Sequence, residues 1–133
     1  MNAKDSKQFV LDFFAEASSG KIDQAWERLA DDMSWRFMTK ASNWPFGQNL
    51  TKWEYRKRFI DNAAAMFPEG LAFTPKNAIA EDDRVSVEAE SLGKLANGKI
   101  YNNVYEYRVD LRDGKIQEIR EYLDSGYTIE ILS

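Results

Sequence analysis

The chain has 133 residues, 44% hydrophobic and 14% aromatic, which suits one buried core and is too short for two. Its 18 basic and 22 acidic residues are interspersed and give a net charge of -4, so we expect neither nucleic acid nor a membrane surface as a partner. Cysteine and histidine are absent, which excludes disulfides, thiol nucleophiles, histidine metal sites and histidine acid-base steps. We therefore expect a single domain over residues 1–133, with no metal or cofactor.

The first third of the chain predicts two helices and a strand. A helix capped by Ser6 and ended by Gly20 is indicated by apolar residues at helical spacing. A second helix follows over residues 22–30. Residues 33–39 then alternate as a strand, which places Met33, Trp35, Phe37 and Thr39 on one face.

A loop and a third helix follow. Residues 40–50 contain a proline and a glycine and favour a loop, yet Trp44 and Phe46 are costly to leave in water. We therefore expect this loop to fold over another part of the protein. A Thr-x-x-Glu capping box at Thr51 starts the third helix, which runs to about Met66.

Four strands complete the predicted fold, over residues 71–80, 84–92, 99–111 and 116–124. Pro75 favours an edge position or a bulge for the first of them. Asp113-Gly114 favours a type I′ hairpin turn between the last two, because both central residues of that turn need a positive φ. The order predicts an α+β fold, with three N-terminal helices on the concave face of a strongly curved antiparallel sheet.

The strand over residues 99–111 has an inner face that is not purely apolar. Alternation places Asn103 and three tyrosines there, and their polar groups need partners if they are buried. An apolar wall with a few polar groups is typical of a small-molecule pocket rather than of a dry core.

Two runs in the C-terminal half carry a family resemblance. Residues 101–105 (YNNVY) and 120–124 (REYLD) resemble the SnoaL-like branch of the nuclear-transport-factor-2-like, or ketosteroid-isomerase-like, superfamily, and the resemblance covers most of residues 5–126. It implies a cone-shaped α+β barrel with a central pocket, of mixed strand order, and sheet-to-sheet homodimers. In this branch an Asn-x-Tyr run commonly faces the pocket, so Asn103 and Tyr105 are expected ligand contacts.

The last strand supplies the candidate catalytic residues. If Tyr122 points into the pocket, alternation places Arg120 and Asp124 on the same face. In the functional interpretation Asp124 is a general acid or base, Tyr122 donates to a developing oxyanion, and Arg120 orients the substrate. In the structural alternative Arg120 forms an ion pair, Tyr122 belongs to the core and Asp124 is a turn residue.

The aromatic residues Trp35, Trp44 and Phe46 are expected to contact the ligand. Glu88 is kept as a partner for Arg120, although patterning places it on the outer face. An epoxide-hydrolase site of this superfamily would need a second inward aspartate, and none is found.

The outer face of the sheet is the expected dimer interface. Its apolar set would be Val104, Ile119, Leu123 and Val85 or Val87, with the mixed charges of Glu106, Arg108 and Glu121 at its rim. Two functions stay open: a cytoplasmic, cofactor-free acid-base enzyme acting on a small apolar carbonyl or cyclic compound, of isomerase, cyclase or hydrolase type, or a non-catalytic ligand-binding or dimeric interaction module.

Overall fold

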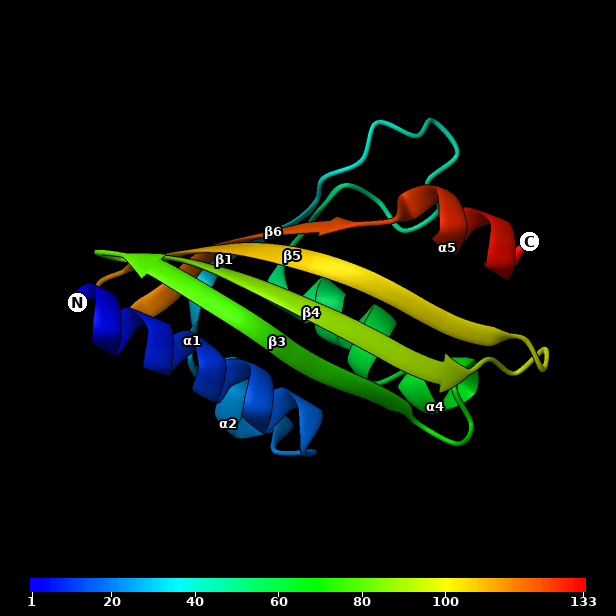
Figure 1. The fold of residues 1–133 in the computed structure, drawn as a ribbon, viewed down its shortest axis with the longest axis horizontal. Coiled ribbons are helices and arrows are strands. Elements are labelled where there is room, and N and C mark those ends of the chain that lie inside the picture. Colours follow the sequence, from blue (N-terminus) through cyan, green and yellow to red (C-terminus); the bar gives the residue numbers. More distant parts are fainter.

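The structure, a computed structural model that describes residues 1–133, contains one arched sheet of six strands (Figure 1). In sheet order β2-β1-β6-β5-β4-β3, the strands are Asn49–Leu50, Leu29–Phe37, Lys115–Leu123, Ile100–Arg112, Arg84–Lys94 and Leu71–Glu81. Neighbouring strands are antiparallel, except that β1 runs parallel to β6. The sheet is therefore mixed, and it is not closed. The predicted α+β class is confirmed.

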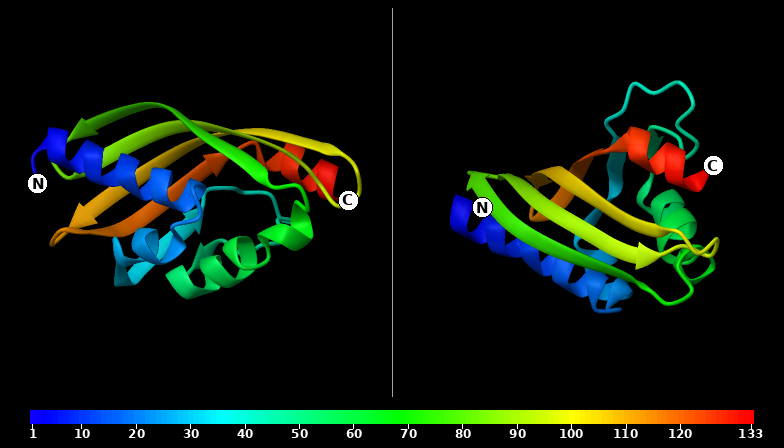
Figure 2. Two further views of the ribbon diagram at one scale, coloured as in Figure 1. Left: turned by 90° about the horizontal axis from the view of Figure 1, so that it is seen from below. Right: turned by 45° about the vertical axis from the view of Figure 1, so that its right-hand side comes forward.

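The helices lie mainly on the concave side of the sheet, as Figure 2 shows from below. They are α1 (Ala3–Ser18), α2 (Ile22–Glu27), α3 (Lys52–Tyr55), the π-helix η1 (Arg56–Ile60), α4 (Ala63–Met66) and α5 (Ser125–Leu132). The predicted third helix is thus divided by a π-helical turn, a feature that is frequent at functional sites. Helix α5 was not predicted, and it follows directly on β6. No helix combines the length and the apolar character that crossing a bilayer requires.

Capping side chains and a glycine mark where the helices begin and end. Asn2, rather than the predicted Ser6, caps α1, because its side chain accepts a hydrogen bond from Asp5 N, while Ser6 is buried inside the first turns. Gly20 has φ +84° just after α1, as predicted. The capping box at Thr51 is formed in both directions.

The β5–β6 hairpin and the β3 edge agree with the sequence. Asp113 has φ 51° and Gly114 has φ 76°, as a type I′ turn requires. Strand β3 forms one edge of the sheet, and its register shifts between Pro75 and Asn77. A bulge relieves the pairing where the proline has no N–H to donate.

A second bulge, in β6, decides which residues face the cavity. Leu111 pairs with Ile116 and Asp110 pairs with Glu118, so Gln117 is an extra residue in β6. The alternation reverses at that point. Consequently Ile116 and Ile119 are both fully buried, and the residues that follow face opposite sides from those expected without a bulge.

The bulge also changes the expected dimer patch. Val85, Val87 and Ile119 belong to the buried core between sheet and helices, and Leu123 packs against that core. Of the expected set only Val104, 60% exposed, lies on the outer face. The predicted placement of this patch is wrong, because a bulge interrupts the alternation of β6 and because Val85 and Val87 lie on the inner face of β4.

Candidate functional site

A cavity of about 390 Å³ lies between the concave face of the sheet and the helices. Of its 26 lining residues 23 are hydrophobic, and the other three are Ser18, Thr128 and Glu121. Glu121 is therefore the only charged side chain that lines it. The volume is in the range of small-molecule sites, which are mostly apolar with a few polar groups.

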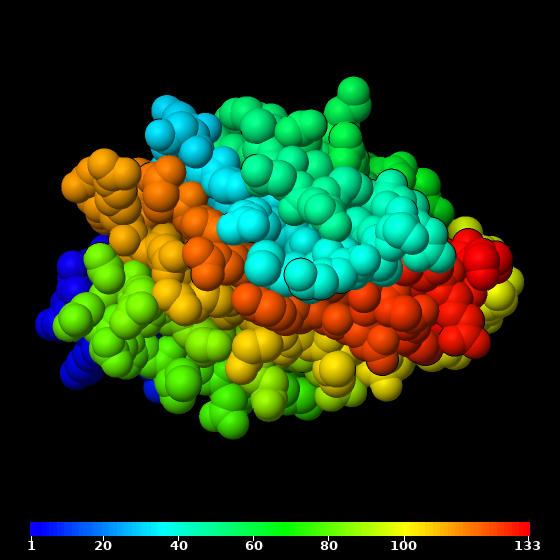
Figure 3. All heavy atoms as spheres, turned by 90° about the horizontal axis from the view of Figure 1, so that it is seen from above, coloured from blue at the N-terminus to red at the C-terminus, as the bar shows by residue number.

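Aromatic rings from four segments form one wall of this cavity. Trp35 of β1 stacks on Tyr55 of α3 with ring centroids 3.5 Å apart and planes 14° apart. The loop before α3 adds Trp44, whose ring lies 5.2 Å from that of Phe37, and Phe46, which makes an edge contact with Phe59. Figure 3 shows this loop in cyan between the green residues of α3 and the orange strand β6.

Trp35, Trp44 and Phe46 thus line the cavity, in the positions that the sequence indicated for them. The loop over residues 40–50 folds back because its two large rings find apolar partners there. Trp44 Nε1 donates to the Gly47 carbonyl at 3.0 Å, and Arg58 donates to the Phe46 carbonyl at 2.8 Å. The first hydrogen bond holds the loop to itself, and the second holds it to η1, which contains Arg58.

Glu121 on β6 is the central polar group of the site. Its side chain is only 4% exposed, and its Oε1 accepts hydrogen bonds from Trp35 Nε1 at 3.0 Å and from the Tyr55 hydroxyl at 3.4 Å. Burial raises the pKa of Glu121 to about 7, although the two hydrogen bonds act in the opposite direction. No arginine or lysine forms an ion pair with it.

Two polar atoms of the cavity wall have no partner in the protein. No hydrogen bond reaches Glu121 Oε2 or the hydroxyl of Tyr107, the residue that pairs with Glu121 across β5 and β6. Ser6 Oγ is the only fully enclosed side-chain oxygen or nitrogen without a partner, so these two atoms open onto the cavity. Burial, and next the charge of Glu121, raises the pKa of Tyr107. Tyr107 therefore stays a neutral hydrogen-bond donor.

A second polar cluster lies further along β5. Ser91 and the Tyr105 hydroxyl are 2.8 Å apart, and the Tyr101 hydroxyl lies 3.0 Å from Thr128 Oγ1. Tyr105 lines the cavity, whereas Asn103 is buried behind it and bonds Tyr101 and Thr128. The expected inward direction of both Asn103 and Tyr105 is correct, but Asn103 supports the wall rather than forming its surface.

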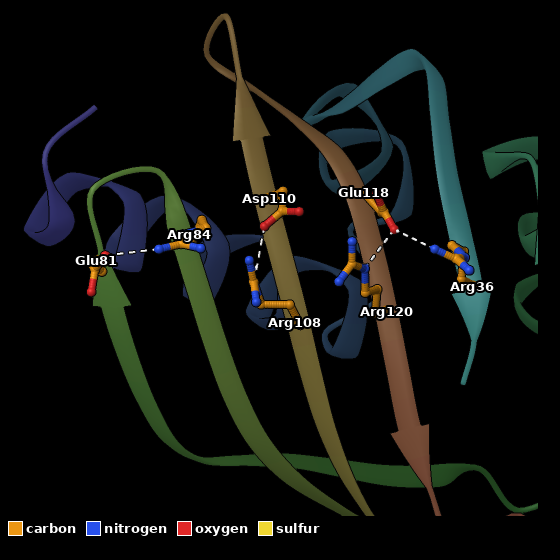
Figure 4. Close-up of polar contacts among 7 residues, drawn as sticks. All are labelled: Arg36, Glu81, Arg84, Arg108, Asp110, Glu118 and Arg120. Carbon is orange, nitrogen blue, oxygen red and sulfur yellow. Dashed lines mark hydrogen bonds and ion pairs between the residues drawn. The ribbon is translucent and has the colours of Figure 1, made fainter. Parts of the chain in front are cut away.

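The three candidate catalytic residues do not face the cavity. Arg120 lies on the outer face and pairs with Glu118 at 2.8 Å (Figure 4). Tyr122 is 43% exposed on the same face. Asp124 is the N-cap of α5, and its carboxylate accepts from Tyr127 N at 3.0 Å. The expected inward orientation was wrong because the bulge at Gln117 reverses the alternation of β6.

Glu88 also lies outside, exposed on β4 opposite Glu106, and the arginine expected to pair with it is bonded to Glu118. Regular alternation along β6 predicts Glu121 at the rim of an outer patch, and this prediction is wrong because Glu121 lines the cavity. One signal was present in the sequence: Ile116 and Ile119 are three residues apart, and a regular strand cannot bury both against one core. No three acidic side chains lie together in a way that would hold a metal ion.

Comparisons with known proteins agree with this architecture. The family model described as SnoaL-like domain matches residues 10–119. No curated protein matches the sequence. Among solved structures, an NTF2-like protein from Burkholderia xenovorans LB400 superposes with a TM-score of 0.77 at 21% identity, covering 98% of this chain and 97% of the other.

Two further solved structures are similar over nearly the whole chain. A putative SnoaL-like polyketide cyclase from Jannaschia sp. CCS1 has a TM-score of 0.75 at 19% identity, with 98% of this chain and 90% of that chain covered. TerC, co-crystallised with polyporic acid, has a TM-score of 0.78 at 17% identity, with 96% and 97% covered. At these identities the likeness concerns the fold.

An open, arched sheet with helices across its concave face defines the class as a cone-like α+β fold. Within that class the chain belongs to the SnoaL-like domain family, because the family model matches most of its length.

Proposed function

We propose that the protein binds a small, largely apolar carbonyl compound in this cavity and catalyses a cofactor-free proton transfer on it, with Glu121 as the acid-base group. The observation that carries the proposal is the unpartnered Oε2 atom of the one charged side chain in an otherwise apolar cavity. The Glu121 side chain as a whole is buried, yet this atom has no partner in the protein and faces space for a ligand.

The two oxygens of Glu121 have different roles in this proposal. Oε1 is occupied by the Trp35 and Tyr55 donors, which fix the position of the carboxylate. Oε2 is then the atom that exchanges a proton. A pKa of about 7 suits both halves of such a reaction at neutral pH, because the ionised and the protonated form are both well populated.

The proposed step is the transfer of a proton from a carbon next to the ligand's carbonyl group to Glu121 Oε2. The electron pair of the broken C–H bond forms the C=C bond of an enolate, and the carbonyl π pair moves to oxygen. A hydrogen bond from the Tyr107 hydroxyl stabilises that oxyanion. Where a C=C bond adjoins that carbon, the enolate is a dienolate, and return of the proton from Oε2 to its γ-carbon completes an isomerisation and restores the carboxylate.

The resemblance supports this reaction type, since the superfamily includes isomerases and cyclases. Two similar structures also fit it: one is a putative polyketide cyclase, and TerC was crystallised with the cyclic compound polyporic acid. The competing function is non-catalytic binding in the same cavity. Homodimerisation and a cytoplasmic location stay predictions.

The test is hydrogen-deuterium exchange at the carbon next to the carbonyl of cyclic and aryl ketones, followed by NMR in D2O. This assay detects proton transfer without knowledge of the natural product. We expect Glu121→Gln to slow the exchange at least about 100-fold, because general acid-base catalysis contributes on the order of 10²–10⁴. Glu106→Gln makes the same charge change on the exposed outer face and should leave the rate unchanged.

Exchange that survives Glu121→Gln would exclude Glu121 as the base. If ketones bind, as tryptophan quenching would report, but none of them exchanges faster than in buffer, the protein is a binding module.

A further inference from the structure

The hydrogen-bond network around Asn103 assigns most of its hydroxyl protons. Asn103 Oδ1 accepts from Val104 N at 2.8 Å, so its amide nitrogen faces inward and donates to the Tyr101 hydroxyl at 2.8 Å and to Thr128 Oγ1 at 2.9 Å. The Asp124 carbonyl, 3.1 Å from Thr128 Oγ1, can only accept. Thr128 therefore donates to this carbonyl, and the Tyr101 proton goes to Thr128 Oγ1 at 3.0 Å.

The other end of the network is Ser91 on β4. Its side chain is fully buried, and its hydroxyl has one partner, the Tyr105 hydroxyl at 2.8 Å. A buried hydroxyl proton without an acceptor is unfavourable, so Ser91 donates to Tyr105. This direction leaves the Tyr105 proton without a partner at normal distance.

The remaining acceptor for the Tyr105 proton is the Tyr101 hydroxyl at 3.5 Å, beyond the usual range for O–H···O bonds. That oxygen already accepts from Asn103. Tyr105 lines the cavity, and its ring is stacked 5.5 Å from that of Tyr107 with planes 20° apart. Both phenols are thus donors on neighbouring positions of one strand, about 6.6 Å apart along it at roughly 3.3 Å per residue.

We propose that Tyr105, oriented by Ser91, is a second anchor of the cavity that donates a hydrogen bond to a second oxygen acceptor of the ligand. The inference rests on the proposed function, because it takes the first oxygen of the ligand to lie at Tyr107 and Glu121. The two anchors together would select elongated apolar ligands that carry a carbonyl or similar oxygen at each of two separated positions. A ligand with a single oxygen leaves the Tyr105 proton unpaired.

The test compares two probes of similar shape, para-diacetylbenzene and para-isopropylacetophenone, which differ in one carbonyl group. We expect calorimetric titration of the native protein to give about fivefold tighter binding of para-diacetylbenzene, the factor that one net hydrogen bond supplies. Tyr105→Phe should make the two affinities equal. Tyr122→Phe removes an exposed phenol from the outer face of the neighbouring strand and should keep the preference.

Infrared spectra give a readout that depends on the hydrogen bond alone. Both carbonyls of bound para-diacetylbenzene should be shifted, and Tyr105→Phe should return one of them to its unshifted position, while the affinity of para-isopropylacetophenone reports whether the variant cavity is intact. Equal affinities of the two probes for the native protein would overturn the second anchor and leave the proposed function standing. Binding of neither probe would overturn both.

Discussion

Strand β6 carries two glutamates in opposite surroundings. On the outer face Glu118 accepts from Arg120 at 2.8 Å and from Arg36 at 3.4 Å, and these contacts, the Arg120 hydrogen bond first, hold its pKa below the usual value. Three residues further on, Glu121 faces the cavity without a cation, and burial raises its pKa to about 7. On this strand the side of the sheet, rather than the residue type, therefore decides whether the pKa of a glutamate lies below or above its usual value.

The other charged side chains on the outer face near Glu118 are paired with opposite charges as well. Figure 4 shows Arg84 bonded to Glu81, Arg108 bonded to Asp110, and Glu118 between two arginines. Every charge drawn there has an opposite partner, and all of these side chains are at least partly exposed to solvent. The cavity wall instead presents two polar atoms with no partner. A ligand gains most from groups that the protein itself has left unpaired.

The largest expected difference between the two faces concerns packing. Ile119 is fully buried on the inner face, so Ile119→Ala should lower the free energy of unfolding of the protein by about 4 kcal/mol, within the range for buried Ile→Ala changes. Val104→Ala on the outer face should cost less than about 0.5 kcal/mol. Urea denaturation of both variants checks this. A small loss for Ile119→Ala would mean that the bulge at Gln117 is misplaced and that Ile119 faces outward.

The fold was predictable from the sequence because local signals fix most of its elements. The capping box at Thr51, the positive φ of Gly114 and the proline at the β3 edge each act within a few residues. Helix α5 was missed because its cap, Asp124, was interpreted as a catalytic group. The parallel pairing of β1 with β6 joins segments that are far apart in sequence, and no local pattern encodes it.

The site was only partly predictable, because some of its residues depend on local patterns and others on how two strands pair. Trp35, Trp44 and Tyr105 were identified as cavity residues because burial of a large ring depends on local alternation and composition. Glu121 was missed because one inserted residue, Gln117, reverses all side chains after it. Bulges depend on how two strands pair, so a single strand's sequence shows them weakly.

After the packing difference, the second-largest expected effect is the pH dependence that Glu121 gives to the free energy of unfolding. Its pKa is about 7 in the folded protein and near the ordinary glutamate value in the unfolded chain, so between these values the folded state holds a proton that the unfolded state has lost. Stability is therefore full below the unfolded pKa, falls as the pH rises towards the folded value of about 7, and levels off above it. We expect the native protein to lose up to about 3 kcal/mol relative to Glu121→Gln between pH 5 and pH 8.

Urea unfolding of both proteins across that pH range measures the difference. Glutamine does not titrate. Subtraction of the stability-versus-pH curve of Glu121→Gln from that of the native protein therefore removes the contribution of all other groups that behave alike in the two proteins. A difference curve that is flat between pH 5 and pH 8 would show that Glu121 is solvated, and it would also remove the basis for a proton carrier in the cavity.

The smallest expected effect belongs to Glu118, and its sign is opposite. The pKa of Glu118 is lowered in the folded state, so its contribution is present above the unfolded pKa and is lost as the pH falls through the folded one. Glu118 and its two arginines are partly exposed, and solvent screens such pairs, so Glu118→Gln should cost less than about 1 kcal/mol at neutral pH. Urea midpoints at low and high salt check this, since added salt should shrink the difference further. A loss that salt leaves unchanged would mean that a second molecule or segment covers these charges, as the predicted dimer through this face would do.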